Sequence, residues 1–146
     1  MSLWSQNALD TLAAAGLRRG GARRAVIERL DAQPCALTAF EVEAAVRGDG
    51  RGASRASVYR VLDELVEHGL VHRIEVGQGI ARFEPVRAEG HHHHLVCEDC
   101  GTVQPFHDDD LERAIGRVAG RVAFAVAEHD ITLHGRCGAC PPASAA

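Results

Sequence analysis

The chain has 146 residues, 46% of them apolar, with a net charge of −4 and a pI near 6.1. This length allows one domain or two small ones, each with a modest core. The overall acidity gives no global signal for nucleic-acid binding, and no stretch resembles a signal peptide or a membrane span. We therefore expect a cytoplasmic protein with reduced thiols and no membrane partner.

The charge is unevenly distributed along the chain. Residues 1–87 hold 12 arginines against 11 acidic residues, a charge of +1, whereas residues 88–146 hold 4 arginines against 9, a charge of −5. The composition also changes after Pro85. We predict domains at residues 1–85 and 91–140, joined by a hinge at 86–90 and followed by a disordered tail at 141–146.

The first elements in chain order are helices. Residues 5–15 form a short amphipathic helix that ends at a glycine. Residues 17–24 then place four arginines around two glycines, before a second helix with Val26, Ile27 and Leu30 facing inward. The arginine cluster either binds phosphate or is a solvated face.

Two further helices follow, each with a recognisable start. Thr38 and Glu41 form a capping box that opens a helix ending near Arg47. After a glycine-rich turn, Ser54 caps a longer helix over residues 55–68, whose apolar residues fall on one stripe. We expect that stripe to face the core.

This helix pair and the segment after it are typical of a DNA-binding motif. Two helices joined by a turn, the second with exposed Tyr59 and Arg60 near its start, indicate a helix-turn-helix. Residues 70–76 and 80–84 alternate around a glycine-containing turn, which predicts a β-hairpin in the position of a wing. A plain structural scaffold is the alternative.

The second half of the chain mixes strands with one helix. The pattern predicts strands at residues 95–96 and 102–106, a helix at 110–121, and two more strands at 122–128 and 130–134. The expected fold is therefore α/β, with a winged helix-turn-helix followed by a small α/β domain.

Four of the five cysteines form two Cys-x-x-Cys pairs. Cys97 and Cys100 are separated from Cys137 and Cys140 by 36 residues. A two-residue spacing lets both sulfurs of a turn reach one ion, so the pairs predict a closed, tetrahedral structural zinc site. A redox dithiol or two disulfides are the alternatives.

A histidine run, residues 91–94, abuts the first cysteine pair. If this run is extended, alternate side chains face opposite ways. His91 and His93 would then serve one metal site and His92 and His94 another, each completed by ligands from elsewhere. A solvated polar loop is the alternative.

Together these motifs resemble the ferric uptake regulator family of bacterial metal-responsive repressors, over nearly the whole chain. The resemblance rests on Ser57-Val58-Tyr59-Arg60, Arg82-Phe83-Glu84, residues 91–100, His129 and the second cysteine pair. It implies an N-terminal winged-helix DNA-binding domain, a C-terminal α/β dimerisation domain with a four-cysteine zinc site, and a homodimer. This dimer would repress transcription by binding AT-rich palindromic operators when it holds metal.

The resemblance also implies which residues bind metal. The structural zinc ligands are Cys97, Cys100, Cys137 and Cys140. A hinge sensor site would use His72, Glu84, His92 and His94, although His72 is alternatively a surface histidine. A second sensor site would use His91, His93, Glu112 and His129.

The expected DNA contacts come from the first half of the chain. Tyr59 is suited to a thymine methyl, Arg55 to a base, and Arg60 with the arginine cluster to phosphates. The residues predicted to bind DNA are Arg18, Arg19, Arg23, Arg55, Ser57, Tyr59 and Arg60.

The ligand types favour zinc as the sensed metal. Many iron and peroxide sensors of the family carry a histidine where this chain has Ala36 and a carboxylate where it has Pro105, whereas zinc sensors often use a ligand at the position of His72. Three histidines and one carboxylate suit tetrahedral Zn²⁺, but Fe²⁺, Mn²⁺ and Ni²⁺ also accept such a set. Glu84 replaces the cysteine usual in zinc sensors. An iron or peroxide regulator is the alternative.

Other functional classes are less consistent with the sequence. A zinc hydrolase or deaminase needs an open coordination position, and no H-x-E motif precedes a C-x-x-C pair in the required order. We therefore expect no enzyme activity. A zinc-stabilised interaction module without DNA binding remains as a third class.

Overall fold

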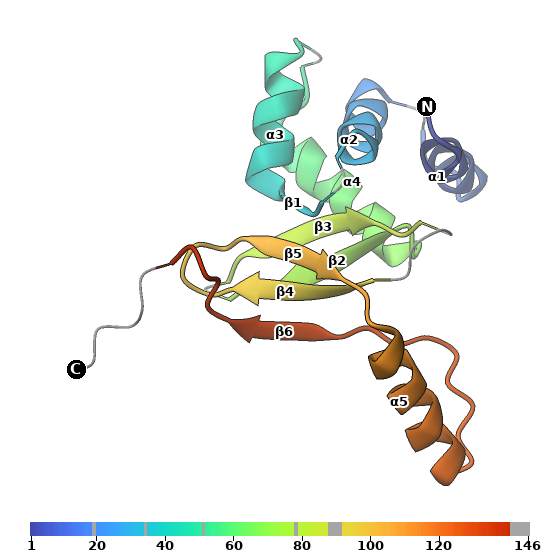
Figure 1. Cartoon of the computed structure of the whole chain (residues 1–146). Coiled ribbons are helices and arrows are strands. Elements are labelled where there is room, and N and C mark those ends of the chain that lie inside the picture. Colours follow the sequence, from blue (N-terminus) through green and yellow to red (C-terminus); the bar gives the residue numbers. More distant parts are fainter. Residues whose placement is uncertain (19, 34, 51, 78, 88–91, 141–146) are drawn as a thin grey trace. The chain divides into compact units, whose positions relative to one another are not determined.

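The computed structural model describes all residues except 19, 34, 51, 78, 88–91 and 141–146 (Figure 1). The chain separates into two compact units, residues 1–88 and 89–146. The predicted disordered tail and residues 88–90 of the predicted hinge lie outside the described residues. The predicted α/β fold class is confirmed, with a winged-helix unit first and a small mixed unit second.

The described residues of the first unit form four helices and one small sheet. In the antiparallel sheet β3 lies between β1 and β2, and β2 and β3 form the predicted hairpin. The short strand β1 was not predicted, because two residues are too few to show alternation. The elements are α1 (Leu3–Ala14), α2 (Gly21–Asp31), β1 (Leu37–Thr38), α3 (Ala39–Gly48), α4 (Arg55–Glu67), β2 (Val71–Glu75) and β3 (Ala81–Pro85).

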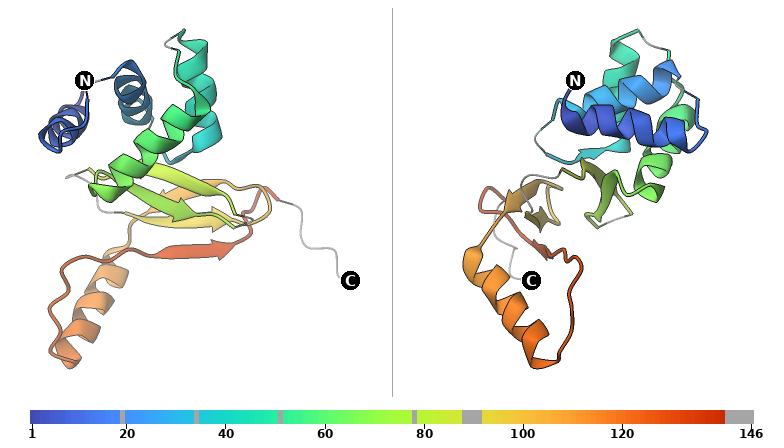
Figure 2. Two further views of the ribbon diagram at one scale, coloured as in Figure 1. Left: turned by 180° about the vertical axis from the view of Figure 1, so that it is seen from behind. Right: turned by 90° about the vertical axis from the view of Figure 1, so that its right-hand side faces the viewer.

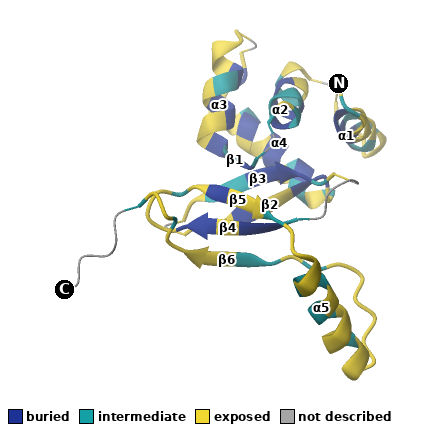
Figure 3. Ribbon diagram, viewed as in Figure 1, coloured by how far each residue is buried: buried dark blue, intermediate teal, exposed yellow. Residues whose placement is uncertain are grey.

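The core of this unit lies where the helices meet. Helix α4 begins as predicted, because the Ser54 side chain accepts a hydrogen bond from the Ser57 N–H, and it ends before Gly69, whose φ is +68°. Its buried residues form one stripe that packs into a continuous cluster with α1, α2 and α3 (Figure 3). The buried residues of this stripe are Val58, Val61, Leu62 and Leu65.

Helix α2 begins earlier than predicted, at Gly21, so the second half of the arginine cluster is helical. Gly20 is extended and offers no side-chain cap. The helix is nevertheless stable at its start, because Ala25, Val26, Ile27 and Leu30 bury one face in the core.

In the second unit, residues 92–140 form a three-stranded sheet and one helix. Strand β4 (His93–Cys97) lies in the middle, antiparallel to β5 (Val103–Phe106) and parallel to β6 (Thr132–Gly135). Helix α5 (Asp109–Arg121) lies in the connection that makes β6 parallel to β4, as two further views show (Figure 2). The Asp108 side chain caps α5 by accepting from the Leu111 N–H.

The predicted strand at residues 122–128 was wrong. All of these residues are described, and none is in a strand. Ala123 has φ +50°, which breaks any extended run. The alternating Val122, Phe124 and Val126 instead stay exposed beside α5, so the alternation reflects a shared face of an irregular segment.

Among the residues that the structure describes, no helix combines the length and apolar character needed to cross a membrane.

Candidate metal centres and nucleic-acid interface

Two turns bring the four paired cysteines together. The Sγ atoms lie 3.6 Å apart for Cys97 and Cys140, 3.7 Å for Cys100 and Cys137, and 3.4 Å for Cys137 and Cys140. A tetrahedral zinc ion with Zn–S bonds of about 2.3 Å needs sulfurs about 3.8 Å apart. All four thiols are free at these distances, and their arrangement fits one tetrahedral zinc ion.

The thiols of this four-cysteine cluster differ in acidity. The Cys137 N–H donates to the Cys97 Sγ at 3.3 Å, and this bond, with the Cys100 N–H, lowers the pKa of Cys97 to about 6. The Thr102 hydroxyl, 3.1 Å from the Cys100 Sγ, lowers the pKa of Cys100. Hydrogen bonding with the Cys137 thiol raises the pKa of Cys140. Cys97 and Cys100 therefore supply the thiolate, the form that binds metal, more readily than Cys140.

A second cluster gathers two histidines around one carboxylate. The Nε2 atom of His93 lies 2.6 Å from Glu112 Oε1, and the Nε2 atom of His129 lies 2.8 Å from Glu112 Oε2. His93 comes from β4, Glu112 from the first turn of α5, and His129 from the loop before β6. The structure thus brings together three of the four predicted ligands of the second sensor site, and the fourth, His91, lies outside the described residues.

The histidine orientation in this cluster is fixed by the backbone. The Ile131 N–H lies 3.2 Å from His93 Nδ1, which leaves the Nε2 edge of the ring facing Glu112. The bond to His93 is the main cause that lowers the pKa of Glu112, with burial opposing and His129 adding to the effect. The cluster offers two nitrogens and a carboxylate to one ion, which fits zinc.

Of the four residues predicted to form the hinge site, two belong to each unit, and each pair is described within its own unit. In the first unit, His72 on β2 is exposed, and its cross-strand partner on β3 is the buried Glu84. Directly opposed residues of an antiparallel pair point to the same face, so these two side chains are neighbours. In the second unit, the rings of His92 and His94 lie 5.0 Å apart. His92 and His94 lie on the opposite side of β4 from His93, because successive side chains along a strand point to opposite faces.

Ala36 and Pro105 stand at two positions where an oxygen-rich or histidine-rich metal site would need a ligand side chain. Ala36 is buried, and its carbonyl accepts from Arg82. Pro105 lies on β5 opposite His94. Neither side chain can bind a metal ion, so neither adds a ligand to the histidines.

Helix α4 presents the predicted DNA-contacting residues. Arg55, Tyr59 and Arg60 are exposed along its first two turns. Asp63 and Glu67 are exposed further along the same helix, so the sign of the surface changes from positive to negative along its length. The N-terminal half of α4 is therefore the half suited to a phosphate-rich partner.

The remaining predicted DNA contacts have different surroundings. Ser57 is half-buried, with its hydroxyl 2.9 Å from the Ser54 hydroxyl, and Arg18 is exposed. Arg23 forms an ion pair of 2.6 Å with Glu64, and its side chain is only 12% exposed. This pair joins α2 to α4, so Arg23 has a structural partner. Arg19 lies outside the described residues.

Sequence reasoning missed the groups that hold the metal ligands in place. Thr102 was detectable from its place two residues after Cys100, where a hydroxyl can reach the thiolate. The Ile131 N–H was not detectable, because any residue supplies a backbone donor. Outside the metal sites, sequence reasoning also missed the buried carboxylate of Glu43, although its helix α3 was predicted.

Comparison with known proteins gives consistent matches. The model of the ferric uptake regulator family matches residues 14–134. The peroxide operon regulator of Bacillus subtilis (strain 168) is 32% identical over 135 residues, 92% of each chain. The ferric uptake regulation protein of Bordetella parapertussis is 36% identical over 104 residues, 71% of this chain and 74% of the relative. The crystal structure of the Vibrio cholerae ferric uptake regulator has a TM-score of 0.77 at 32% identity, covering 88% of this chain and 98% of that one.

Proposed function

The chain belongs to the ferric uptake regulator family, and we propose on that premise that it is a cytoplasmic, zinc-sensing repressor of metal uptake genes. Members of this family are metal-dependent, DNA-binding transcription regulators rather than enzymes, and they are dimeric. The family thus establishes the class of function. We propose the sensed metal, the operator and the ligand residues from the features of this chain.

The first unit supplies the DNA-binding surface in this proposal. Arg55, Tyr59 and Arg60 on the positive half of α4 would enter the major groove of an AT-rich palindromic operator. Tyr59 is 46% exposed and suited to a thymine methyl, whereas Arg60 is suited to a phosphate. Arg18 and Arg19 would add phosphate contacts, while Arg23 contributes through its pair with Glu64.

The observation that carries the zinc assignment is the donor set. Histidine nitrogen predominates in the His93, Glu112 and His129 cluster, and Ala36 and Pro105 add no donor. Nitrogen-rich sets with one carboxylate suit four-coordinate Zn²⁺, whereas Fe²⁺ and Mn²⁺ favour more oxygen ligands and higher coordination. The four-cysteine cluster is proposed as a separate, structural zinc site.

We assign His72, Glu84, His92 and His94 to a hinge sensor site, because the first pair belongs to the wing and the second to β4 and the residue before it. A shared ion supplies a link between the two units. Metal would then act as corepressor if it binds the DNA-competent arrangement better than any other. His91, His93, Glu112 and His129 form the second sensor site in this proposal.

An iron or peroxide regulator is the second candidate. The observation that favours it is the relative from Bacillus subtilis, which is named for a peroxide operon and matches over 92% of both chains. Three histidines and one carboxylate also bind Fe²⁺, Mn²⁺ or Ni²⁺. The donor set and the relatives therefore favour different metals, and metal titration separates them.

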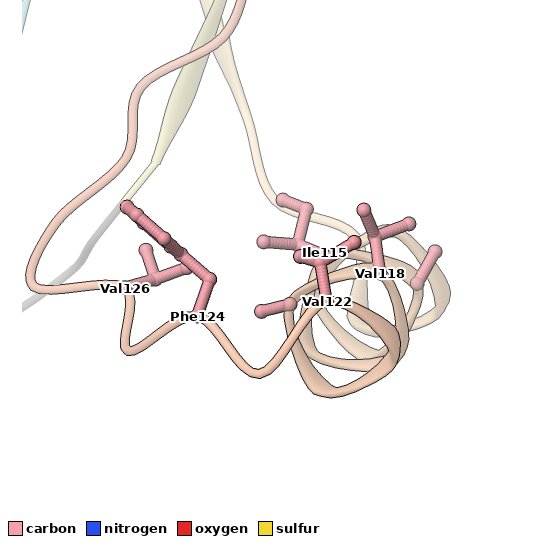
Figure 4. A pocket seen from close by; sticks show the side chains of 7 residues that line it. Ile115, Val118, Val122, Phe124 and Val126 are labelled. Atoms are coloured by element: carbon pink, nitrogen blue, oxygen red, sulfur yellow. The ribbon is translucent and has the colours of Figure 1, made fainter.

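A homodimer would cover the apolar face of the second unit. Ile115, Val118, Val122, Phe124 and Val126 line a hollow of about 320 Å³ on α5 and the following loop (Figure 4). Val122 and Phe124 are 68% and 66% exposed. Exposed apolar surface of this kind marks an interface. A two-fold axis would place the face against its own copy, setting the spacing of two α4 helices.

The test combines metal and DNA binding. The full-length protein, stripped of labile metal but with its four-cysteine zinc retained, is titrated with Zn²⁺, Fe²⁺, Mn²⁺ and Ni²⁺ while binding to the promoter of its own gene is followed. We expect Zn²⁺ alone to restore binding at buffered trace concentrations, His72→Ala and His93→Ala to weaken the response, and His68→Ala to leave it unchanged. Restoration by Fe²⁺ or Mn²⁺ with no effect of His72→Ala would establish the second candidate.

A further inference from the structure

A buried carboxylate connects α3 to the start of α4. Glu43 is 3% exposed, and its two oxygens are taken by two arginines. Arg47, one turn further along α3, donates to Oε1, and Arg55, the first residue of α4, donates from Nε to Oε2 at 2.9 Å. Both oxygens of the carboxylate are thus hydrogen-bonded, and both arginines belong to the helix-turn-helix.

The contact with Glu43 orients Arg55 without covering it. The Arg55 side chain remains 66% exposed, and Arg47 remains 69% exposed. Because Arg55 uses Nε toward Glu43, its Nη1 and Nη2 groups form the outward end of the guanidinium. This end is a planar pair of donors that matches two acceptors on one partner. Arg55 stands one turn before Tyr59 on the same helix face.

Packing alone does not explain a glutamate at this position. A buried carboxylate costs desolvation free energy, and an apolar residue of similar volume would pack between two helices at least as well. Its negative charge would also repel nearby DNA phosphates. A glutamate that carries both the desolvation cost and the repulsion of phosphates is explained if it fixes the direction of an arginine that contacts DNA.

We propose that Glu43 is a positioning residue for DNA recognition, holding Arg55 so that its Nη1 and Nη2 donors meet a pair of acceptors on DNA. This inference rests on the proposed DNA-binding function. The pair is either O6 and N7 of one guanine or two oxygens of one phosphate, which the guanidinium fork fits equally. The position of Arg55 at the start of α4 is where a recognition helix contacts base edges.

The first experiment tests Arg55. The metal-loaded full-length protein selects binding sites from a random duplex library, and affinities are then measured for the selected duplex and for duplexes changed at one base pair. Loss of one bidentate contact in Arg55→Ala should weaken binding about tenfold or more. Arg55→Lys keeps the charge without the fork, so it recovers most of the affinity if the partner is a phosphate and little if it is a guanine. A guanine partner also predicts that Arg55→Ala loses its preference at one base pair only.

The second experiment asks whether removing the charge of Glu43 weakens or strengthens DNA binding. Glu43→Gln should weaken binding in the same direction as Arg55→Ala, and the double variant should be no weaker than Arg55→Ala alone. Glu67→Gln is the matched control, because it removes one exposed negative charge at the far end of α4 and should bind as well as the wild type or better. If Glu43→Gln also binds better, its charge merely repels DNA and the positioning role is wrong.

Folding and function are separated by one further measurement. Circular dichroism gives the folded fraction of each variant, and Arg55→Ala and Arg55→Lys change an exposed side chain, so they are interpretable even if Glu43→Gln unfolds. Unchanged affinity and preference in folded Arg55→Ala would overturn the proposal. Failure of the wild type to select any duplex would instead overturn the proposed DNA-binding function.

Discussion

Helices α4 and α5 have the same length and similar amphipathic patterns, yet they end up in opposite situations. Each has 13 residues. Helix α4 buries Val58, Val61, Leu62 and Leu65. Helix α5, all of whose residues are described, buries none, and its ribbon is coloured exposed or intermediate throughout (Figure 3). Its Val118 is 58% exposed. The hydrophobic cluster of the described residues lies entirely between Trp4 and Phe83.

The difference teaches that the two units gain stability from different sources. The first unit follows the ordinary rule that apolar stripes meet in a core. The second buries little apolar surface in a sheet of 4- and 5-residue strands, so we expect thiolate, histidine and intermolecular contacts to take the place of a core. We therefore expect the stability of the second unit to depend on bound metal and on a second copy of the chain.

The largest effect should come from removing the structural zinc ligands. Cys97→Ser is expected to lose zinc and unfold the second unit, because structural zinc contributes about 10–16 kcal/mol in small domains. The first unit should keep its helices. Zinc content and limited proteolysis measure this, with Cys35→Ser as the control that retains zinc. A zinc-free Cys97→Ser protein whose second unit still resists protease would show that this unit does not depend on metal for its stability.

The next effect should come from the exposed apolar face. Val118→Asp places a charge on each copy of a two-fold interface and should weaken dimerisation by about 2 kcal/mol or more per copy. Sedimentation equilibrium measures the dissociation constant. Leu3→Asp is the matched control, since Leu3 is 92% exposed in the first unit and should leave the dimer intact. Equal dimerisation of both variants would show that this face is not the interface.

A smaller effect is expected in the core of the first unit. Leu62 is fully buried within α4, so Leu62→Ala should lower the free energy of unfolding by about 2–5 kcal/mol. Urea unfolding followed by fluorescence of Trp4, the single tryptophan, reports on this unit. Leu3→Ala should change it by less than about 0.5 kcal/mol. If zinc removal destabilised the first unit as much as the second, the view that the two units are stabilised separately would be wrong.

The same contrast explains what the sequence could predict. In the first unit the stripe of α4, the Thr38 capping box and the β2–β3 hairpin all have strong local signals, and each was predicted. In the second unit residues 122–128 alternate as a strand does, but their apolar side chains have no core within the chain to bury against. The Cys-x-x-Cys spacing and the histidine run indicated metal. The contact of Glu43 with Arg55 depends on the packing of α3 against α4 and has no local signal, whereas its pair with Arg47 has the i,i+4 spacing of a helix.

The smallest effect concerns the attachment of α1 to the first unit. The Asp31 carboxylate accepts from the Ser2 N–H at 3.0 Å and lies 3.3 Å from the Arg87 guanidinium. Burial opposes ionisation, but the hydrogen bonds from Ser2, with Ser5 and Arg87 adding to them, lower the pKa of Asp31. Because the folded pKa is depressed, the stability it contributes is fully present above the unfolded pKa and is lost as pH falls through the folded value. Asp31→Asn should therefore cost about 1–2 kcal/mol near neutral pH.

The pH dependence of that cost distinguishes an ionic role from a packing role. The difference in unfolding free energy between wild type and Asp31→Asn should stay constant above about pH 5 and shrink below about pH 4, toward the lowered pKa of Asp31. Urea titrations followed by Trp4 fluorescence measure it, with the exposed Asp63→Asn as control. A difference that persists unchanged at low pH would show that Asp31 holds α1 in place by packing and neutral hydrogen bonds, and that its charge contributes nothing.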